Sequence, residues 1–345
     1  MKKLRLVLLP FSLIYGLVTA IRNALYNNGV FASCGFSIPV IAVGNLSTGG
    51  TGKTPQTEYL IRLLAPIYKV AVLSRGYGRK SEGYVLANET ASAQTLGDEP
   101  FQFFTKFKDS IRVAVDANRV AGITNLLGLS PKPEVIVLDD AYQHRKVTAG
   151  FYILLTAYGD IYTDDFILPA GNLRESRSGA KRAGVIVVTK CPTDISAKEQ
   201  QQIIGRLKPK QGQQVFFSCI AYDDLVYGDN GTKSVTDIKN EPKVLVAGIA
   251  KPQPFYDYLK SDGDSVKTYP DHHEFTETEI NELIQLSETK TIVTTEKDYM
   301  RLKGRLPQCK LFYLPIKSRF ITGGNNFDKT ILNYVERSTA NSRLH

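Results

Sequence analysis

Cysteine is scarce in this chain, and its distribution argues against two kinds of architecture. Four of the 345 residues are cysteines, and no two of them form a C-x-x-C pair. Scattered cysteines do not favour a disulfide framework or a clustered metal site, and they suit a reducing cytosol. These residues are Cys34, Cys191, Cys219 and Cys309.

The sequence also lacks internal repeats and low-complexity tracts. Hydrophobic residues make up 43% of the chain and charged residues 22%, which is typical of a globular protein and not of a disordered or polytopic membrane protein. Because 345 residues exceed the usual size of a single hydrophobic core, we expect two lobes.

Basic residues outnumber acidic ones, which gives a formal net charge of +9. This excess suits an acidic partner such as a nucleotide, a phospholipid headgroup or a nucleic acid. The sequence has no run of basic residues interleaved with aromatic ones. The net charge is therefore the one feature in favour of a nucleic-acid partner, and it is not specific. We therefore expect no nucleic-acid binding.

The N-terminus combines basic residues with an apolar run. Lys2, Lys3 and Arg5 precede an uncharged stretch over residues 6–21, and Arg22 closes it. As a helix this stretch would cover about 24 Å, which is short of the ~30 Å hydrocarbon core of a bilayer. We therefore favour a helix that lies in the membrane interface, with its basic residues at anionic headgroups.

Two alternatives to the interfacial helix stay open. Pro10 and Gly16 weaken a membrane span further, but an ordinary core helix would fit the same residues. A secretory signal is the other alternative, because Val18 and Ala20 are small residues of the kind that precede a cleavage point. The chain also contains a glycine-rich loop of the nucleotide-binding kind at residues 47–54, and an enzyme that uses ATP needs the cytosol, which disfavours the signal.

Residues 40–55 contain the strongest local signal, because they read as a buried strand, a glycine-rich loop and the first turn of a helix. Such a loop directs backbone N–H groups at an anion, Lys53 adds a positive charge, and the Thr54 hydroxyl can ligate Mg²⁺. Ser47 stands where the usual spacing begins with glycine. The loop predicts triphosphate binding by Ser47, Thr48, Gly49, Gly50, Thr51, Gly52, Lys53 and Thr54.

Short apolar runs rich in β-branched residues recur along the chain, with helical patterns between them. This alternation predicts an α/β fold, with a mostly parallel, P-loop NTPase-like sheet covered by helices. A second series of runs predicts a smaller α/β lobe. The first series covers residues 40–43, 70–73, 111–115, 135–138, 152–155 and 185–188, and the second covers 215–220, 243–247 and 291–295, with a helix near 277–287.

These patterns divide the chain into three parts. We expect an N-terminal interfacial helix over residues 1–30 and a core with the phosphate loop over 31–216. Residues 217–315 would form the smaller lobe, and residues 316–345 would pack back on the core. The segment 208–214 is a plausible junction, since it carries lysine, glutamine and glycine.

The run Glu-Val-Ile-Val-Leu-Asp-Asp over residues 134–140 places two carboxylates at the end of a predicted strand. A strand-end aspartate opposite a phosphate loop is typical of a Mg²⁺ site. Adjacent carboxylates repel each other unless a cation lies near them, which supports the same interpretation. We expect Mg²⁺ to be bound by Thr54, Asp139 and Asp140.

Several polar segments accompany these two motifs, and together with Gly44-Asn45 they resemble the tetraacyldisaccharide 4'-kinase family, the lipid A 4'-kinases. The set is specific, although no single member of it is. Small departures concern loop shape: Ala141-Tyr142 stands where the family often has Gly-Phe, and Asn172 where it often has Pro. The segments are Ser74-Arg75-Gly76-Tyr77-Gly78-Arg79, Gly97-Asp98-Glu99-Pro100, Gln143-His144-Arg145, Leu168-Pro169-Ala170-Gly171, Leu173-Arg174-Glu175 and Asp271-His272.

The resemblance implies an enzyme that uses ATP and Mg²⁺. It would move the γ-phosphate onto the 4'-hydroxyl of a tetraacylated disaccharide 1-phosphate, a step of lipid A biosynthesis. Its partners would be that lipid and the cytoplasmic face of the bacterial inner membrane. The acyl chains must stay near the bilayer while the sugar reaches the site, which an N-terminal interfacial helix would allow.

The resemblance also implies roles for individual residues. Lys53 would lie on the β- and γ-phosphates, and Asp98 would be the general base that takes the proton of the 4'-hydroxyl. His272 is our choice as the partner of Asp98, with His273 and His144 as alternatives. Because Asp98 and His272 fall in different lobes, joining them would require lobe closure. Substrate contacts are expected from Arg75, Glu99, His144, Arg174 and Glu175.

One alternative function comes from a different class of protein. Glycine-rich loops of this kind also occur in regulatory and positioning ATPases or GTPases, and Thr189-Lys190 faintly resembles a guanine-recognition loop. A full Asn-Lys-x-Asp is absent from the sequence, which disfavours this alternative.

Overall fold

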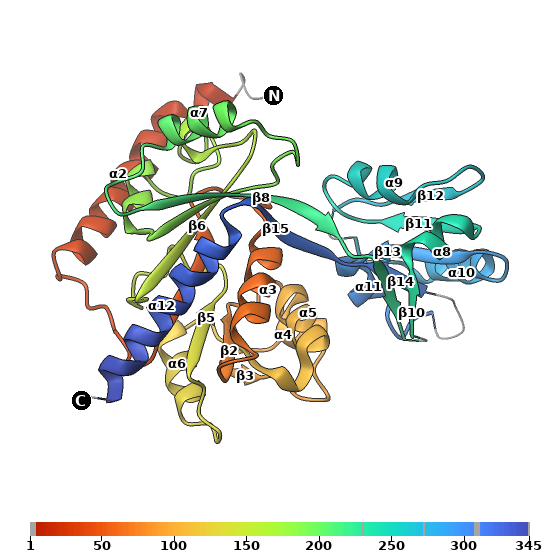
Figure 1. Cartoon of the computed structure of the whole chain (residues 1–345), viewed down its shortest axis with the longest axis horizontal. Helices are drawn as coiled ribbons and strands as arrows, with labels where there is room; N and C mark the ends of the chain where they lie inside the picture. Colours follow the sequence, from red (N-terminus) through yellow and green to blue (C-terminus); the bar gives the residue numbers. More distant parts are fainter. Residues whose placement is uncertain (1–4, 230, 272, 307–310, 344–345) are drawn as a thin grey trace.

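The described residues form two β-sheets, which lie in a larger and a smaller lobe (Figure 1). The computed structural model describes residues 5–229, 231–271, 273–306 and 311–343. Two long antiparallel strands, β8 and β15, extend from the larger lobe toward the smaller one (Figure 1). The chain therefore crosses between the lobes once in each direction along neighbouring strands.

The larger sheet has nine strands, and its seven central strands run parallel. The two edge strands, β15 and β3, run antiparallel to their neighbours. In spatial order the strands are β15 (Ile316–Thr322), β8 (Gln214–Tyr222), β7 (Val185–Thr189), β6 (Phe151–Ala157), β1 (Val40–Asn45), β5 (Val135–Leu138), β2 (Val70–Ser74), β4 (Ile111–Val115) and β3 (Val85–Leu86).

The smaller sheet has six strands, four of which run parallel. Strand β9 runs antiparallel to both of its neighbours, so this sheet is mixed. In spatial order the strands are β10 (Gly231–Ser234), β9 (Leu225–Gly228), β14 (Leu311–Leu314), β13 (Thr291–Thr295), β11 (Lys243–Ala247) and β12 (Ser265–Thr268).

Helices cover both sheets, and the described part of the N-terminus forms one along the edge of the larger lobe (Figure 1). The helices of the larger lobe are α2 (Leu9–Asn27), α3 (Lys53–Leu64), α4 (Ala93–Leu96), α5 (Asp98–Phe107), α6 (Arg119–Leu127), α7 (Ala197–Leu207) and α12 (Gly324–Arg343). Those of the smaller lobe are α8 (Val235–Asn240), α9 (Gln253–Leu259), α10 (Glu277–Ser287) and α11 (Glu296–Leu302). Short 3₁₀ turns lie at Leu6–Leu8, Lys108–Ser110, Tyr162–Asp164 and Arg177–Arg182.

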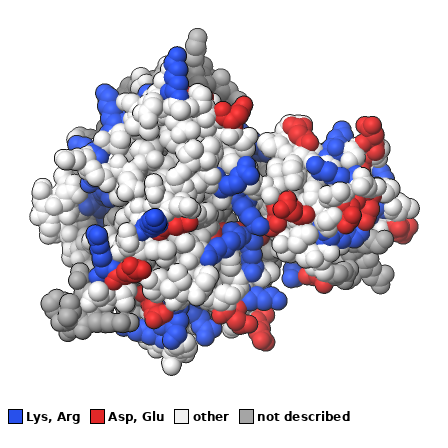
Figure 2. Space-filling model, in the orientation of Figure 1, with Lys and Arg blue, Asp and Glu red and all other residues white. Residues whose placement is uncertain are grey.

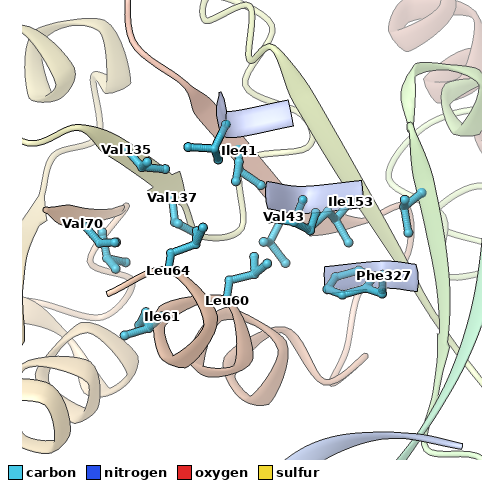
Figure 3. Packing of buried hydrophobic residues seen from close by; sticks show 14 of the residues in the cluster. Ile41, Val43, Leu60, Ile61, Leu64, Val70, Val135, Val137, Ile153 and Phe327 are labelled. Carbon is cyan, nitrogen blue, oxygen red and sulfur yellow. The ribbon is translucent and has the colours of Figure 1, made fainter. Parts of the chain in front are cut away.

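Helix α3 packs its apolar face on the centre of the larger sheet. Leu60, Ile61 and Leu64 recur at a spacing of three to four residues, so they project from one side of the helix. They meet side chains of the central strands, including Ile41 and Val43 of β1 (Figure 3). This packing fixes α3 directly after β1, which puts the loop between them at the carboxyl end of the parallel strands.

The fold class predicted from the sequence is confirmed, with one difference in strand assignment. The predicted strand at 215–220 is β8, and it pairs with β7 of the larger sheet instead of starting the smaller one. The smaller sheet begins at Leu225 of β9. The division of the chain at residues 30, 216 and 315 stays a proposal, and the sheets favour a boundary just after β8.

The N-terminal helical segment is longer than the uncharged run alone suggested. It extends over Leu6–Asn27, and its 22 residues are long and apolar enough to cross a membrane by length and composition. The estimate of about 24 Å was therefore too short. Of the described residues of α2, Ser12 is the one that is buried, and side chains such as Leu13 and Leu17 are 74% and 61% exposed.

The C-terminal helix α12 contributes to the core of the larger lobe through Phe327, which is fully buried (Figure 3). We expect Phe327→Ala to lower the free energy of unfolding by about 3–5 kcal/mol, because it removes buried ring contacts and leaves a cavity. Thermal and urea unfolding of the purified protein measure this. Phe166→Ala, whose ring is 48% exposed, is the matched control and should change stability by less than about 1 kcal/mol.

Candidate active site

The glycine-rich loop lies between the end of β1 at Asn45 and the start of α3 at Lys53. Gly49 and Gly52 have φ angles of 107° and 82°, in the left-handed region that glycine adopts without a steric cost. Gly52 is the N-cap of α3, so the free N–H groups of the first helical turn open toward the loop. The predicted phosphate cradle thus has the backbone conformation that such a site requires.

Side chains from two strand ends hold this loop in place. The Asn45 amide donates to the Thr51 hydroxyl at 2.7 Å, and the Thr189 hydroxyl donates to the Thr51 carbonyl at 2.7 Å. The Lys190 ammonium donates to the Gly50 carbonyl at 2.6 Å. Sequence reasoning missed these roles, since it considered the pair 189–190 only as a faint nucleotide-base signal. Their position at the ends of predicted parallel strands was the signal that could have revealed them.

Lysines from both lobes lie near Lys190, which bonds to the loop. Burial lowers the pKa of Lys190, and the nearby positive charges of Lys251, Lys297 and Lys53 lower it further. Lys251 and Lys297 belong to the smaller lobe, and Lys53 and Lys190 to the larger one. Figure 2 shows Lys and Arg side chains gathered where the two lobes meet. Positive charges this close repel each other, and an anion between them would relieve that repulsion.

Asp139 follows β5 and is buried, with 5% of its surface exposed. The Thr57 hydroxyl donates to one carboxylate oxygen at 3.1 Å and the Ser74 hydroxyl to the other at 3.4 Å. Burial and the neighbouring charges of Asp140 and Glu99 nevertheless raise the pKa of Asp139 to about 6. The buried negative charge is thus only partly compensated. The donor set therefore fits a hard divalent cation such as Mg²⁺.

Asp140 lies between two cations that the sequence assigned to different parts of the site. Its carboxylate is 3.7 Å from the Lys53 ammonium and accepts from the Arg174 guanidinium at 3.3 and 3.4 Å. The residue has a φ of 45°, in the left-handed region, two residues after β5 ends. The structure thus brings together a predicted phosphate ligand, a predicted metal-site acid and a predicted substrate residue.

Asp98 begins α5 and meets the smaller lobe. Its carboxylate accepts from the Arg301 guanidinium of α11. The neighbouring Glu99 accepts from Lys297 of the same helix at 3.3 Å. Gly97 has a φ of 91° and lies so close to the Tyr77 carbonyl that an added Cβ would be 2.8 Å from it. The sequence did not reveal Arg301, because nothing near residue 301 links it to residue 98.

Three histidines were considered as the partner of Asp98, and the structure describes two of them. His272 lies outside the described residues. His273, its first alternative, bonds to Glu279 at 2.9 Å and stacks on Tyr269. Glu279 also completes the capping box that begins α10. These contacts occupy the imidazole of His273 within the smaller lobe and disfavour it as the partner of Asp98.

His144, the second alternative, belongs to the larger lobe. Burial lowers its pKa to about 4, and the positive charges of Arg119 and Arg75 act in the same direction. The imidazole is therefore neutral near pH 7, and one of its nitrogens can accept a hydrogen bond. Arg75 itself is exposed, directly after β2.

Glu175 is 3% exposed and belongs to a dense polar cluster. Both terminal nitrogens of Arg182 donate to it, at 3.0 and 2.8 Å, and the Gln143 amide donates at 3.1 Å. The Asn23 amide of α2 donates at 2.7 Å. Sequence reasoning assigned Glu175 to the substrate and missed Arg182 and Asn23.

A second ion cluster, between α3, α5 and α11, also joins the two lobes. The Lys106 ammonium of α5 is 2.8 Å from Glu58 of α3 and 2.8 Å from Glu296 of α11. Both carboxylates are at least 95% buried. Burial and the charge of Glu58 raise the pKa of Glu296 to about 7. The Lys106 cation, whose side chain is 14% exposed, therefore links the phosphate-loop helix to the smaller lobe.

Comparisons with known proteins agree over nearly the whole chain. The model of the tetraacyldisaccharide-1-P 4'-kinase family matches residues 4–336. The tetraacyldisaccharide 4'-kinases of Flavobacterium johnsoniae and Flavobacterium psychrophilum are each 57% identical to this chain. The match to the first covers 98% of this chain and 99% of the relative. The match to the second covers 99% of this chain and 100% of the relative. A crystal structure of LpxK from Aquifex aeolicus in complex with ATP is 31% identical, with a TM-score of 0.77, over 96% of this chain and 99% of that one.

The buried charge of Asp139 leads to a prediction about stability. Because its folded-state pKa is raised from 3.8 to about 6, the folded chain binds more protons than the unfolded chain in this pH window. The free energy of unfolding should therefore fall as pH rises through the window. Without nucleotide or metal, we expect Asp139→Asn to stabilise the protein by as much as about 3 kcal/mol at neutral pH.

Urea unfolding between about pH 4 and pH 7.5 measures this effect. The advantage of Asp139→Asn should shrink toward pH 4, where the wild-type carboxyl is protonated. Asp109→Asn, at an exposed position of the same lobe, is the matched control and should give the wild-type curve. A pH-independent difference would show that Asp139 acts through packing instead of charge.

Proposed function

This chain belongs to the tetraacyldisaccharide-1-P 4'-kinase family, and from that premise we propose that it transfers the γ-phosphate of ATP to the 4'-hydroxyl of a tetraacylated disaccharide 1-phosphate. The family resemblance and the kinase activity predicted from the motifs are confirmed. The observation that carries the residue assignments is the buried Asp139, which lies beside the phosphate loop and opposite Lys53.

The donor half of the site is the loop from Ser47 to Thr54. Its backbone N–H groups would hold the phosphates, and Lys53 would neutralise charge on the β- and γ-phosphates. Thr54 and Asp139 would hold Mg²⁺, with Asp140 supporting them. The ion, when bound, supplies positive charge to the phosphate oxygens as the γ-phosphoryl group moves.

Asp98 would act as the general base for the acceptor. A carboxylate within hydrogen-bond reach of the 4'-hydroxyl accepts its proton as the oxygen attacks phosphorus. Its place at the contact between the lobes supports this role, because an acceptor bound there would lie between the two halves of the chain. Arg301 fixes the Asp98 carboxylate in the ligand-free chain, and His272 stays our proposed partner for the proton transfer.

Arg174, Arg75 and His144 would contact the acceptor or its phosphate. Arg174 already reaches Asp140, so it lies next to the donor half of the site. Glu175 is completely engaged by its neighbours, and we assign it to the positioning of Arg174 instead of to substrate contact. Glu99, paired with Lys297, would help to hold the smaller lobe over the site.

The N-terminal helix would bring the enzyme to the cytoplasmic face of the inner membrane. Exposed apolar side chains cover one side of α2, including Ile14, Leu17 and Ile21. Its other side contacts the larger lobe, as in the bond from the Asn23 amide to the Glu175 carboxylate. A helix attached along its length in this way supports lying in the interface more than crossing the bilayer.

A phosphoryl-transfer assay with ATP, Mg²⁺ and a tetraacylated disaccharide 1-phosphate tests the proposed reaction. We expect Asp98→Ala to lower kcat by about 10²–10⁴-fold, because it removes the base, and to leave nucleotide binding nearly unchanged. Lys53→Ala should weaken nucleotide binding as well as transfer. Asp109→Ala is the control for a surface carboxylate.

Two outcomes would contradict the proposal. Transfer by Asp98→Ala at the wild-type rate would remove Asp98 from the mechanism. Wild-type enzyme that hydrolyses ATP at the same rate with and without the lipid, and never phosphorylates it, would instead support a regulatory ATPase.

A second experiment tests the membrane surface. We expect the double variant Leu13→Ser/Leu17→Ser to bind anionic phospholipid vesicles at least about tenfold more weakly, because burial of two leucines in the interface is lost. Ile67→Ser removes an apolar side chain that is 59% exposed elsewhere on the larger lobe, and it should bind like wild type. Equal vesicle sedimentation of all three proteins would exclude α2 as the anchor.

A further inference from the structure

Residues 168–175 lie between α2 and the phosphate loop, and we refer to them as the bridging segment. On the side of the phosphate loop, the Thr48 N–H donates to the Asn172 carbonyl at 2.7 Å. The Arg174 N–H donates to the Leu46 carbonyl, also at 2.7 Å. Ser47 and Leu173 form an antiparallel β-bridge between these two bonds. The bridging segment therefore fixes the first part of the phosphate loop.

On its other side the bridging segment is bonded to the N-terminal helical segment. The Arg5 guanidinium donates to the carbonyls of Pro169 and Gly171 and to the Asn172 side chain. The Ser12 hydroxyl accepts from the backbone N–H of Ala170 at 2.9 Å. These contacts give hydrogen-bond partners to the carbonyls of Pro169 and Gly171 and to the N–H of Ala170. Backbone groups of a loop that is covered by a helix need such partners, because water reaches them poorly.

Arg5, Ser12 and Asn23 project from one face of the N-terminal helical segment. Successive positions differ by about 100°, so residues 5, 12 and 23 point in nearly the same direction. Gly16 is on this face as well, and an added Cβ there would lie 3.2 Å from Ile167. The exposed apolar residues Ile14 and Ile21 occupy the opposite side. An anchor needs only the apolar side, so the polar side requires another explanation.

The most informative polar contact is the one from Asn23. Its amide donates to a Glu175 oxygen at 2.7 Å, and that oxygen also accepts from Arg182. The other Glu175 oxygen accepts from the side-chain amide nitrogen of Gln143. The side-chain amide oxygen of Gln143 is in turn 3.5 Å from the Arg174 guanidinium, which donates to it. A continuous polar network thus leads from α2 through Glu175 and Gln143 to Arg174.

The network continues to the donor half of the site. Arg174 pairs with Asp140, and Asp140 is 3.7 Å from the Lys53 ammonium. We propose that Asn23 is a positioning residue of the kinase reaction, acting through Glu175 to orient Arg174 against Asp140. The apolar side of α2 faces outward while its polar side holds the bridging segment, so one helix serves both the membrane surface and the geometry of the site.

The test separates positioning from anchoring, and it rests on the proposed transfer reaction. Rates are measured with the lipid acceptor in detergent micelles, so that vesicle binding does not limit them. We expect Asn23→Ala to lower kcat/KM for the lipid about tenfold, because Glu175 loses a charge-assisted bond, while vesicle binding stays at the wild-type level. Asn28→Ala, an exposed asparagine just after the same helix, should match wild type in both measurements.

A double-mutant cycle with Glu175→Gln shows whether Asn23 acts through Glu175. We expect the double variant to be no slower than Glu175→Gln alone, because both changes interrupt the same network. Asn23→Gln, which keeps an amide, should recover part of the lost rate. Tyr15→Phe removes only the bond to the Arg174 carbonyl, and it should lower kcat/KM two- to fivefold even if Asn23→Ala folds poorly.

Several results would overturn the inference. They are wild-type kcat/KM for Asn23→Ala, or losses in the double variant that multiply as independent effects. Failure of the wild-type enzyme to phosphorylate the lipid would instead defeat the proposed function. Active wild type beside an equally active Asn23→Ala would defeat only the positioning role.

Discussion

The candidate site depends on holding two adjacent carboxylates, those of Asp139 and Asp140, beside several lysines and a loop that binds phosphates. A loop built for phosphates lies beside Asp139 and Asp140, and the Asp139 carboxylate is buried at some cost, as its raised pKa of about 6 shows. Positive charge has to balance both, and the structure supplies it from several directions. Lys53 and Lys190 come from the larger lobe, and the smaller lobe adds more. The parallel sheet makes this possible, because it brings the ends of β1, β5 and β7 to one edge.

The two lobes meet through charged groups that also belong to the chemistry. Lys106 lies between Glu58 of the phosphate-loop helix and Glu296 of α11, and Asp98 meets Arg301 of the same α11. A shift of α11 would therefore disturb the ion pairs of Glu58, in the middle of α3, and of Asp98, the proposed base. Buried ion pairs contribute little net stability, but their geometry is strict, since a misplaced buried charge is expensive. This restricts the arrangements that the lobes can adopt.

Much of the fold could be predicted because its signals are local. Each predicted strand of the larger sheet is an apolar run, and α3 shows the spacing of Leu60, Ile61 and Leu64. The strand at 215–220 was placed in the wrong series, since an apolar run does not reveal which neighbour it pairs with. The site was partly predictable for the same reason. Asp98, Asp139 and Lys53 lie in recognisable motifs, whereas Arg182 and Lys190 do not.

The sequence by itself determined the α/β class, the phosphate loop, the apolar N-terminal segment and the family, since each of these is carried by short motifs of residues that are close together in the chain. Only the tertiary structure decided which side chains meet. Arg301 and Asp98 are 203 positions apart, and Asn23 and Glu175 are 152 apart. Contacts over such separations leave no local pattern, because they form only after the sheets and helices have packed and brought distant segments within a few ångströms.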